Sequence, residues 1–393
     1  MKHDWEYKKL GEVCGFRRGS FPQPYGEPKW FDGENAMPFV QVADMQDDNF
    51  DLVSNTKNKI SQLAQPFSVF VPKGIVLVSL QGSIGKVAIT QYDCYVDRTV
   101  AIFNQLNEAI WNKKFFAYSI KTIFEEKRKI ARGISIKTIT KEEFSDFECA
   151  VPPLPTQQSI VSELDSLSKI IADCKETLKD YDALEQSIFY DMFGDPVKNE
   201  KGWEVKKLGE CCKVISGFAF PSNDFSEHNE IKAVKITNVG VKEFVFDNMS
   251  LPSSYLTKSD YILYEYDIVI ALTRSVISTG FKRAYVPFEY DKSLLNQRVA
   301  ALKIPNLELR TFIYNYLGSD FVKNYVMEKA TALMQPNLSI GDLKNMPIFY
   351  PTNQLLQQFA SKIEAIEQMK TETKKALQEA ETLFNARMDY WFN

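Results

Sequence analysis

The sequence predicts a tandem duplication of a mixed α/β (α+β) domain, with two long antiparallel coiled-coil helices separating the domains in a pseudo-two-fold symmetric arrangement. Three observations predict this fold. The phrase WEYKKLGEVC at residues 5–14 returns as WEVKKLGECC at residues 203–212, with eight of ten positions identical. Further paired motifs follow each copy in the same order, which indicates an internal repeat. A segment with heptad spacing of apolar residues then ends each copy.

The repeat extends through both domains. The paired motifs are GSFP (19–22) with GFAFP (217–221), PFVQVADM (38–45) with AVKITNVG (233–240), GIVLVSLQGS (from 74) with DIVIALTRS (from 267), and VDRTVAIF (96–103) with NQRVAALK (296–303). Short β-branched and aromatic runs bounded by Gly, Pro and Asp predict strands. One helical segment follows in each copy, and a last short strand ends at prolines.

Both predicted long helices carry apolar residues at alternating spacings of four and three, a seam that favours packing against a partner helix. The first seam comprises Ile160, Leu164, Leu167, Ile171, Cys174, Leu178, Tyr181, Ile188 and Met192, and skips one position at Glu185. The second comprises Leu356, Phe359, Ile363, Ile366, Thr373, Leu377, Ala380, Phe384 and Trp391. The simplest arrangement pairs the two helices antiparallel. The alternative packs each helix on its own domain.

We therefore divide the chain into a first domain (1–155), a central long helix (156–193), a second domain (194–351) and a C-terminal long helix (352–393). The first domain holds 20 Lys and Arg against 19 Asp and Glu, and the second holds 19 against 18. Each domain is nearly neutral, so the net charge of −4 comes from the helices. The domains can still carry local basic faces.

Composition and motifs favour a binding protein over an enzyme. The sequence has no run of about 18 apolar residues and no secretory leader, so we expect a cytoplasmic protein that makes no membrane contact. Six cysteines without Cys-x-x-Cys spacing and two separate histidines predict free thiols, with neither a metal nor another cofactor. The stretch GSIGK at 82–86 lacks the first Gly and the final Ser or Thr of a phosphate-binding loop.

The repeated WEYKKLGEV and WEVKKLGEC, together with MPFVQVADM, GSIGKVAI, NQRVAALK and VPPLPTQQSIVSELDSL, resemble the specificity subunit of type I restriction–modification enzymes. The resemblance covers essentially the whole chain. It implies a non-catalytic subunit with two target recognition domains, each reading one half of an interrupted double-stranded DNA site. It also implies partners, namely two modification subunits that carry the methyltransferase and restriction subunits that carry the translocase and nuclease.

Reading DNA requires side chains that reach base edges, most often Arg, Lys, Asn and Gln, together with phosphate anchors. The candidates in the first domain are Arg17, Arg18, Gln81, Ser83, Lys86 and Arg98. Those in the second are Lys213, Thr273, Arg274, Ser275, Lys282, Arg283, Gln297 and Arg298. Many of these residues interrupt runs of apolar, strand-forming residues. A loop at such a place can expose their side chains, and the sheet keeps the loop rigid. The alternative for each is a solvated charge or a structural ion pair.

Outside the paired motifs the two halves share little, so we expect the two half-sites to differ and the target to be asymmetric. Nearly neutral domains neutralise few phosphates, so we expect weak DNA binding by the isolated chain. Two other classes remain open. One is a non-catalytic scaffold whose duplicated domains bind two protein subunits, and the other is an enzyme with an unrecognised site.

Overall fold

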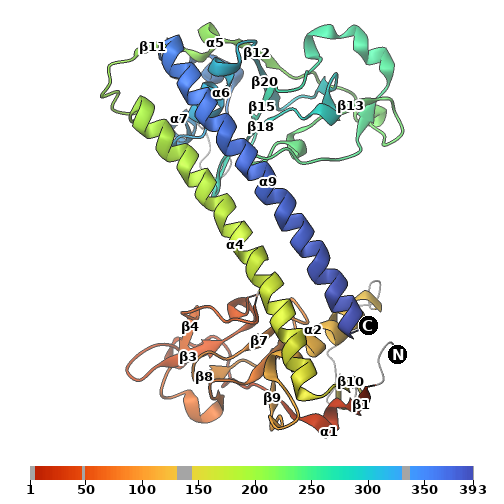
Figure 1. Ribbon diagram of the computed structural model, residues 1–393. Helices are drawn as coiled ribbons and strands as arrows, with labels where there is room; N and C mark the ends of the chain where they lie inside the picture. The colour runs from red at the N-terminus through yellow and green to blue at the C-terminus, as the bar shows by residue number, and fades with distance from the viewer. Residues whose placement is uncertain (1–4, 47–48, 131–143, 330–336, 393) are drawn as a thin grey trace. The chain divides into compact units, whose positions relative to one another are not determined.

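The computed structural model describes residues 5–46, 49–130, 144–329 and 337–392, and of the segment 126–130 only the backbone. The chain divides into two compact units. Unit 1 comprises residues 1–177 and 373–393, and unit 2 comprises residues 178–372. The helix α4 (Leu154–Phe193) begins in unit 1 and ends in unit 2, whereas α9 (Asn353–Phe392) begins in unit 2 and ends in unit 1 (Figure 1).

In its described residues, the domain of unit 1 contains two four-stranded sheets and a two-stranded sheet. Their strand orders are β2-β9-β6-β7, β4-β3-β8-β5 and β1-β10. The elements are β1 (Glu6–Lys9), α1 (Leu10–Val13), β2 (Gly15–Arg18), β3 (Met37–Val40), β4 (Asn58–Ile60), β5 (Val69–Val71), β6 (Val76–Ser79), β7 (Val87–Ile89), β8 (Cys94–Val96), β9 (Val100–Asn104), α2 (Lys113–Ile130) and β10 (Glu148–Val151).

Unit 2 repeats this topology, because its sheet β12-β20-β15-β18 corresponds strand by strand to β2-β9-β6-β7. Its remaining sheets are β14-β13-β19, β16-β17 and β11-β21. The elements are β11 (Glu204–Lys207), α5 (Leu208–Cys211), β12 (Lys213–Ser216), β13 (Ile231–Val234), β14 (Ser250–Leu251), β15 (Ile268–Ala271), β16 (Val276–Ile277), β17 (Gly280–Phe281), β18 (Arg283–Tyr285), β19 (Leu294–Leu295), β20 (Val299–Lys303), α6 (Leu307–Tyr316), α7 (Asp320–Lys329), α8 (Ile340–Asn345) and β21 (Pro347–Tyr350). The predicted duplication of a mixed α/β domain is confirmed.

One prediction differs from the structure in unit 2. The single helical segment expected after β20 is two helices, α6 and α7, which are separated at Gly318. A β-carbon at Gly318 would lie 2.2 Å from Nη2 of Arg283, so this guanidinium fills the space beside the break.

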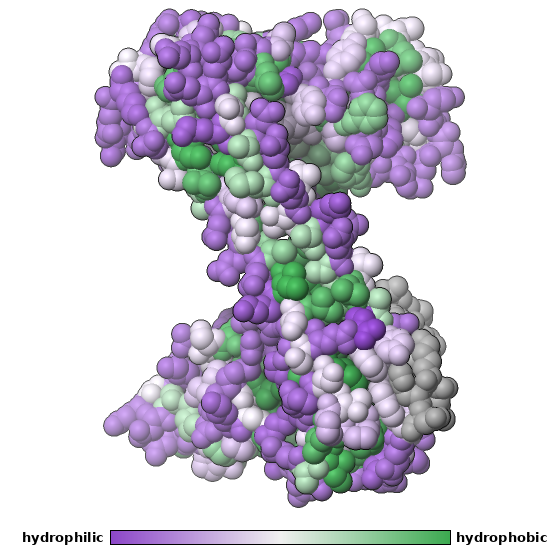
Figure 2. Space-filling model, in the orientation of Figure 1, coloured by the Kyte–Doolittle hydropathy of each residue, from purple (hydrophilic) through white to green (hydrophobic). Residues whose placement is uncertain are grey.

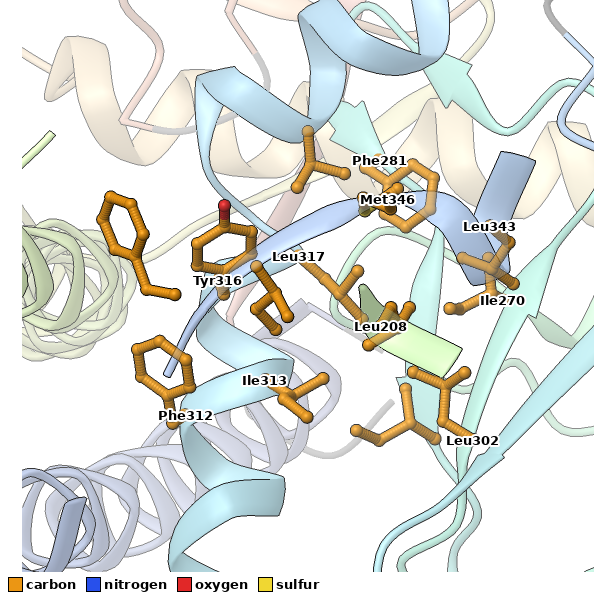
Figure 3. Close-up of a cluster of buried hydrophobic side chains, with 14 of the residues drawn as sticks. Leu208, Ile270, Phe281, Leu302, Phe312, Ile313, Tyr316, Leu317, Leu343 and Met346 are labelled. Atoms are coloured by element: carbon orange, nitrogen blue, oxygen red, sulfur yellow. The ribbon is translucent and has the colours of Figure 1, made fainter. Parts of the chain in front are cut away.

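The repeated opening phrase closes each domain on itself. Its first strand pairs antiparallel with the last strand of the same domain, β1 with β10 and β11 with β21. The leucine that follows is completely buried in both copies, and its amide donates to that last segment: Leu10 N to Phe147 O at 2.8 Å, and Leu208 N to Met346 O at 2.9 Å. Figure 3 shows Leu208 among the buried side chains of α6, α8 and the four-stranded sheet of unit 2. The phrase is therefore repeated because each domain needs this closure.

The paired GSFP and GFAFP motifs also have a steric cause. Gly19 N donates to Val100 O, and Gly217 N donates to Val299 O, both at 3.0 Å. A β-carbon at Gly19 would lie 2.1 Å from Val96 O, and one at Gly217 would lie 1.9 Å from Asn296 O. Only glycine allows this approach of two backbone segments.

In unit 1, α4 and α9 run antiparallel side by side. Glu163 on α4 accepts hydrogen bonds from Arg387 Nη2 and Trp391 Nε1 on α9, each at 3.0 Å. Further along α4, Lys175 Nζ lies 3.3 Å from Glu381 Oε1. The apolar residues of both helices join the core of the domain, among them Ile160, Val161, Leu164 and Met388.

In unit 2 the same antiparallel pairing holds. Phe189 and Phe193 of α4 lie against Phe359 of α9, with ring centres 6.0 and 5.0 Å apart, and all three join the core around Phe312. The predicted helix pair is confirmed. The two arrangements considered from the sequence occur together, because each helix end also packs on a domain.

An ion cluster with two buried members interrupts the apolar seam of unit 2. Glu185 and Lys370 are both buried, and Lys370 Nζ donates to Glu185 Oε1 at 2.6 Å and to Asp182 Oδ1 at 2.9 Å. Lys242, from the domain, lies 3.1 Å from Glu185 Oε2. Glu367 Oε1 lies 3.3 Å from Lys370 Nζ. Burial opposes charge at Asp182 and Glu185, but the bonds from Lys370 and the charge of Lys242 outweigh it and lower the pKa of both carboxyls.

We expect Lys370→Met to lower the free energy of unfolding at pH 7 by roughly 3–5 kcal/mol, because it leaves the buried carboxylate of Glu185 with Lys242 as its remaining cation. Carboxyls with a lowered folded pKa stabilise the protein above their unfolded pKa, about 4, and this stabilisation is lost as the pH falls through the folded values. The difference between variant and parent must therefore shrink below pH 5. Denaturant unfolding from pH 7 to pH 3 measures it. Lys375→Met, which removes an exposed ion pair with Glu379, is the control.

We expect Gly217→Ala to lower the free energy of unfolding by about 1–3 kcal/mol, because the added methyl group overlaps the Asn296 carbonyl. Gly341→Ala is the matched control. A β-carbon at Gly341 meets its nearest neighbour at an ordinary 3.6 Å, inside a helix that alanine favours. Urea unfolding of both variants tests this, and equal stabilities would contradict the steric explanation.

Candidate nucleic-acid interface

Two loops meet at one edge of the sheet β2-β9-β6-β7 in unit 1. The turn between β6 and β7 and the turn between β8 and β9 are joined by a hydrogen bond from Leu80 N to Thr99 O at 2.8 Å. Gln81, Ser83 and Arg98 lie in these turns with exposed side chains. The structure therefore brings together three of the residues singled out from the sequence.

Arg98 belongs to a polar and aromatic surface that the sequence did not reveal. Its guanidinium lies 5.4 Å from the centre of the Tyr25 ring, a cation–π geometry. The Tyr25 hydroxyl accepts from Gln41 Nε2 at 2.8 Å, and Gln41 Oε1 accepts from Asn58 at 2.7 Å. Burial raises the pKa of Tyr25, so its hydroxyl stays neutral. The only sequence signal for Tyr25 was an aromatic residue just after the GSFP motif.

The equivalent loops of unit 2 are joined in the same way, by a hydrogen bond from Leu272 N to Arg298 O at 2.8 Å. Arg274, Gln297 and Arg298 are exposed there. Thr273 is half-buried and forms a β-bridge with Asn337. This edge thus carries two exposed arginines where unit 1 carries one.

The backbone of the second edge is strained at both arginines. Arg274 has φ +50° and Arg298 has φ +67°, in the left-handed region that residues with a side chain rarely adopt. Aligning the units on their matching hydrogen bonds places Gly82, with φ +69°, opposite Arg274. Unit 2 therefore holds an arginine at a backbone position where unit 1 uses glycine.

Other candidates lie away from the loops. Lys213 is exposed and pairs with Lys303 at the first position of β12, which corresponds to Gly15 of β2. It is therefore not the structural counterpart of Arg17 and Arg18 and lies at the opposite end of its strand from Arg298. Arg17 is exposed within β2, and Arg18 is half-buried at the end of β2 nearer the loops.

Arg283 and Ser275 are buried, which corrects their assignment as DNA contacts. Arg283 Nε donates to Tyr314 O at 2.7 Å, and its guanidinium stacks 4.8 Å from the Tyr314 ring. The side chain connects β18 to α6 and has no surface with which to reach a ligand. Its role is structural.

Lys86 and Lys282 occupy equivalent places at the end of their hairpin turns, and both are half-buried. Lys86 Nζ donates to Met45 O at 3.2 Å. Lys282 donates its backbone amide to Ser275 O at 2.8 Å. The side chain of Lys86 is therefore hydrogen-bonded to a neighbouring loop of its own domain.

The described residues contain no group of three or more His, Cys, Asp or Glu arranged to hold a metal ion. The six cysteines are free, and burial raises the pKa of Cys14, Cys94 and Cys149 to about 12, so these thiols stay protonated. Within the described part of the chain, no helix has the length and apolar character needed to span a membrane. The faces drawn in Figure 2 are mainly hydrophilic, with scattered apolar patches.

The sequence matches the family described as the type I restriction modification DNA specificity domain twice, over residues 2–180 and 200–382. The type I restriction enzyme MjaIX specificity subunit of Methanocaldococcus jannaschii is 23% identical over 397 residues, which cover 92% of this chain and 87% of that subunit. The EcoAI specificity subunit of Escherichia coli is 33% identical over 135 residues, 33% of this chain and 23% of that subunit.

Two solved structures share the fold along nearly the whole chain. The S subunit of a type I restriction-modification system from M. genitalium has a TM-score of 0.55 and 16% identity, covering 98% of this chain and 95% of that one. A chain from a structural study of complex assembly and conformational transition in a type I R-M system has a TM-score of 0.57 and 18% identity, covering 99% and 97%.

Proposed function

Because the chain belongs to the type I restriction modification DNA specificity family, we propose that it is the subunit that recognises the target sequence of a type I restriction–modification complex. Each domain, residues 1–155 and 194–351, reads one half of a split double-stranded site. The observation that carries this proposal is the repeated sheet edge, where two hydrogen-bonded turns present exposed polar and basic side chains in both units.

The chemistry of these edges suits base recognition. Arg can donate two hydrogen bonds to guanine, and Gln can pair with adenine in the major groove. Gln81, Ser83 and Arg98 offer this set in unit 1, and Arg274, Gln297 and Arg298 offer it in unit 2. Arg17, Arg18, Lys86, Lys213, Thr273 and Lys282 are proposed as secondary contacts to phosphate or sugar. The two sets differ in residue type, which supports an asymmetric target.

The chain is a recognition subunit rather than an enzyme, and its partners supply the chemistry. We propose that it acts in the cytoplasm and binds two modification subunits, which carry the methyltransferase, as well as restriction subunits. Each domain is nearly neutral overall, so few phosphates are neutralised by the chain itself. The partners would then complete the enclosure of the duplex.

We expect the isolated chain to bind DNA weakly and with little sequence preference at physiological salt, because affinity for DNA depends strongly on phosphate neutralisation. Adding the modification subunits should raise both affinity and selectivity. Fluorescence anisotropy with target and scrambled duplexes, with and without these subunits, measures both. Tight, selective binding by the chain alone would contradict the expectation.

We expect Arg98→Ala to relax selectivity in one half-site and Arg274→Ala in the other, each costing about 1–3 kcal/mol at the base pair concerned. Methylation profiling on a library randomised in both half-sites measures the two effects in one experiment. Lys375→Ala, at an exposed position of α9 outside both loops, is the control and should change neither profile. If either variant lost selectivity equally in both half-sites, the arginines would contact phosphates instead of bases.

A further inference from the structure

Each apolar seam contains a buried charged position in unit 2, and these two positions meet. The seam of α4 is interrupted at Glu185, and the seam of α9 steps from Ile366 to Thr373 past Lys370. Both charged residues are buried, and Lys370 Nζ lies 2.6 Å from Glu185 Oε1. Each interruption therefore has its complement on the other helix.

The internal repeat makes this complementarity informative. The two helices begin at Leu154 and Asn353, so equivalent positions differ by 199 residues. The equivalent of Lys370 on α4 is Ile171, and the equivalent of Glu185 on α9 is Phe384. Ile171 and Phe384 line the same cavity in unit 1, so apolar side chains occupy both positions that correspond to the ion pair. The ion pair is present at only one of the two equivalent places.

Duplicated helices with similar seams have three ways to pair. They can form the α4·α9 pair, or two copies of the chain can pair α4 with α4, or α9 with α9. An α4·α4 pair in the same register would set Glu185 against Ile171 at both ends. An α9·α9 pair would set Lys370 against Phe384. Only the α4·α9 pair joins the two buried charges.

Neighbouring charges do not remove the penalty for the like-with-like pairs. In an α4·α4 pair, Lys175 of the other copy would face Asp182, but Glu185 would find Ile171 where Lys370 was and would keep only Lys242, 3.1 Å away. In an α9·α9 pair, Lys370 would keep Glu367 of its own helix and face Glu381 in place of the exposed Asp182, but Phe384 would replace its buried partner Glu185. Breaking a buried ion pair is strongly destabilising, and one polar residue in a seam can fix which helices associate.

We propose that Glu185 and Lys370 select the α4·α9 helix pair over like-with-like pairing between copies of the chain. The selection keeps the first and second domains of one chain on one helix pair. A like-with-like pair would instead join two identical domains. If the proposed function holds, such an assembly would read a symmetric sequence. The buried ion pair therefore ensures that the protein reads an asymmetric target.

The test uses a cysteine reporter in the full-length chain. Because Glu185 would face Ile171, an α4·α4 pair is symmetric about Leu178, and Leu178→Cys places two thiols together only in that pair. In the α4·α9 pair, residue 178 faces α9 instead. The chain is unfolded in denaturant, refolded and oxidised, and the disulfide-linked dimer is measured on a non-reducing gel. The native cysteines without Leu178→Cys give the background.

Three variants are compared in the Leu178→Cys background. Glu185→Met with Lys370→Met removes the buried charges at similar volume, and we expect at least fivefold more linked dimer than in the parent. Lys175→Met with Glu381→Met removes an exposed pair between the same helices, and we expect no increase. Ile171→Lys leaves the native pair intact and gives Glu185 a partner in the α4·α4 pair, so we expect more dimer here too.

Circular dichroism checks that each variant regains the helical content of the parent. If the double methionine variant does not refold, Ile171→Lys decides the question. Refolded variants that form no more linked dimer than the parent would overturn the proposal. The assay contains no DNA, so a negative result would not bear on the proposed recognition of a split site. Likewise, a failure of DNA recognition would not bear on the proposed selection of the helix pair.

Discussion

Burial of the helix seams is the constraint on which the rest of the structure depends. An amphipathic helix of 40 residues cannot leave its apolar stripe in water. In each unit, α4 and α9 cover part of that stripe with each other and insert the remainder into a domain core. The domain of unit 1 is consequently completed by the end of α9, which lies far from it in the sequence, whereas unit 2 contains the two helix segments that directly flank its domain. The cores of units 1 and 2 thus contain residues from both long helices.

The duplication and the helices could be predicted from the sequence because their signals are local. Identical phrases, strand-like runs and the heptad period need no knowledge of long-range contacts. The seam also marked Glu185 as an exception. Its partner Lys370 stayed hidden, since it was passed over in the second seam and the two are 185 residues apart. Pairing between distant segments is set by register, which one sequence does not specify.

The candidate interface was predictable only in part for the same reason. The turns that follow buried strands were visible in the sequence, and Arg98, Arg274 and Arg298 are exposed in them. Arg283 looked similar, yet it is buried, because the carbonyl and ring of Tyr314 on a distant helix hold its guanidinium. Tyr25 reaches this surface because of the way the chain folds, and no short sequence motif predicts its position.

The loops at each sheet edge are joined through main-chain atoms, the amides of Leu80 and Leu272 and the carbonyls of Thr99 and Arg298. Bonds of this kind persist whatever side chain each position carries. The exposed residues can accordingly mutate with little risk to folding, as the difference between Gly82 and Arg274 illustrates. Such an arrangement gives the protein room to evolve new sequence preferences while its framework stays the same.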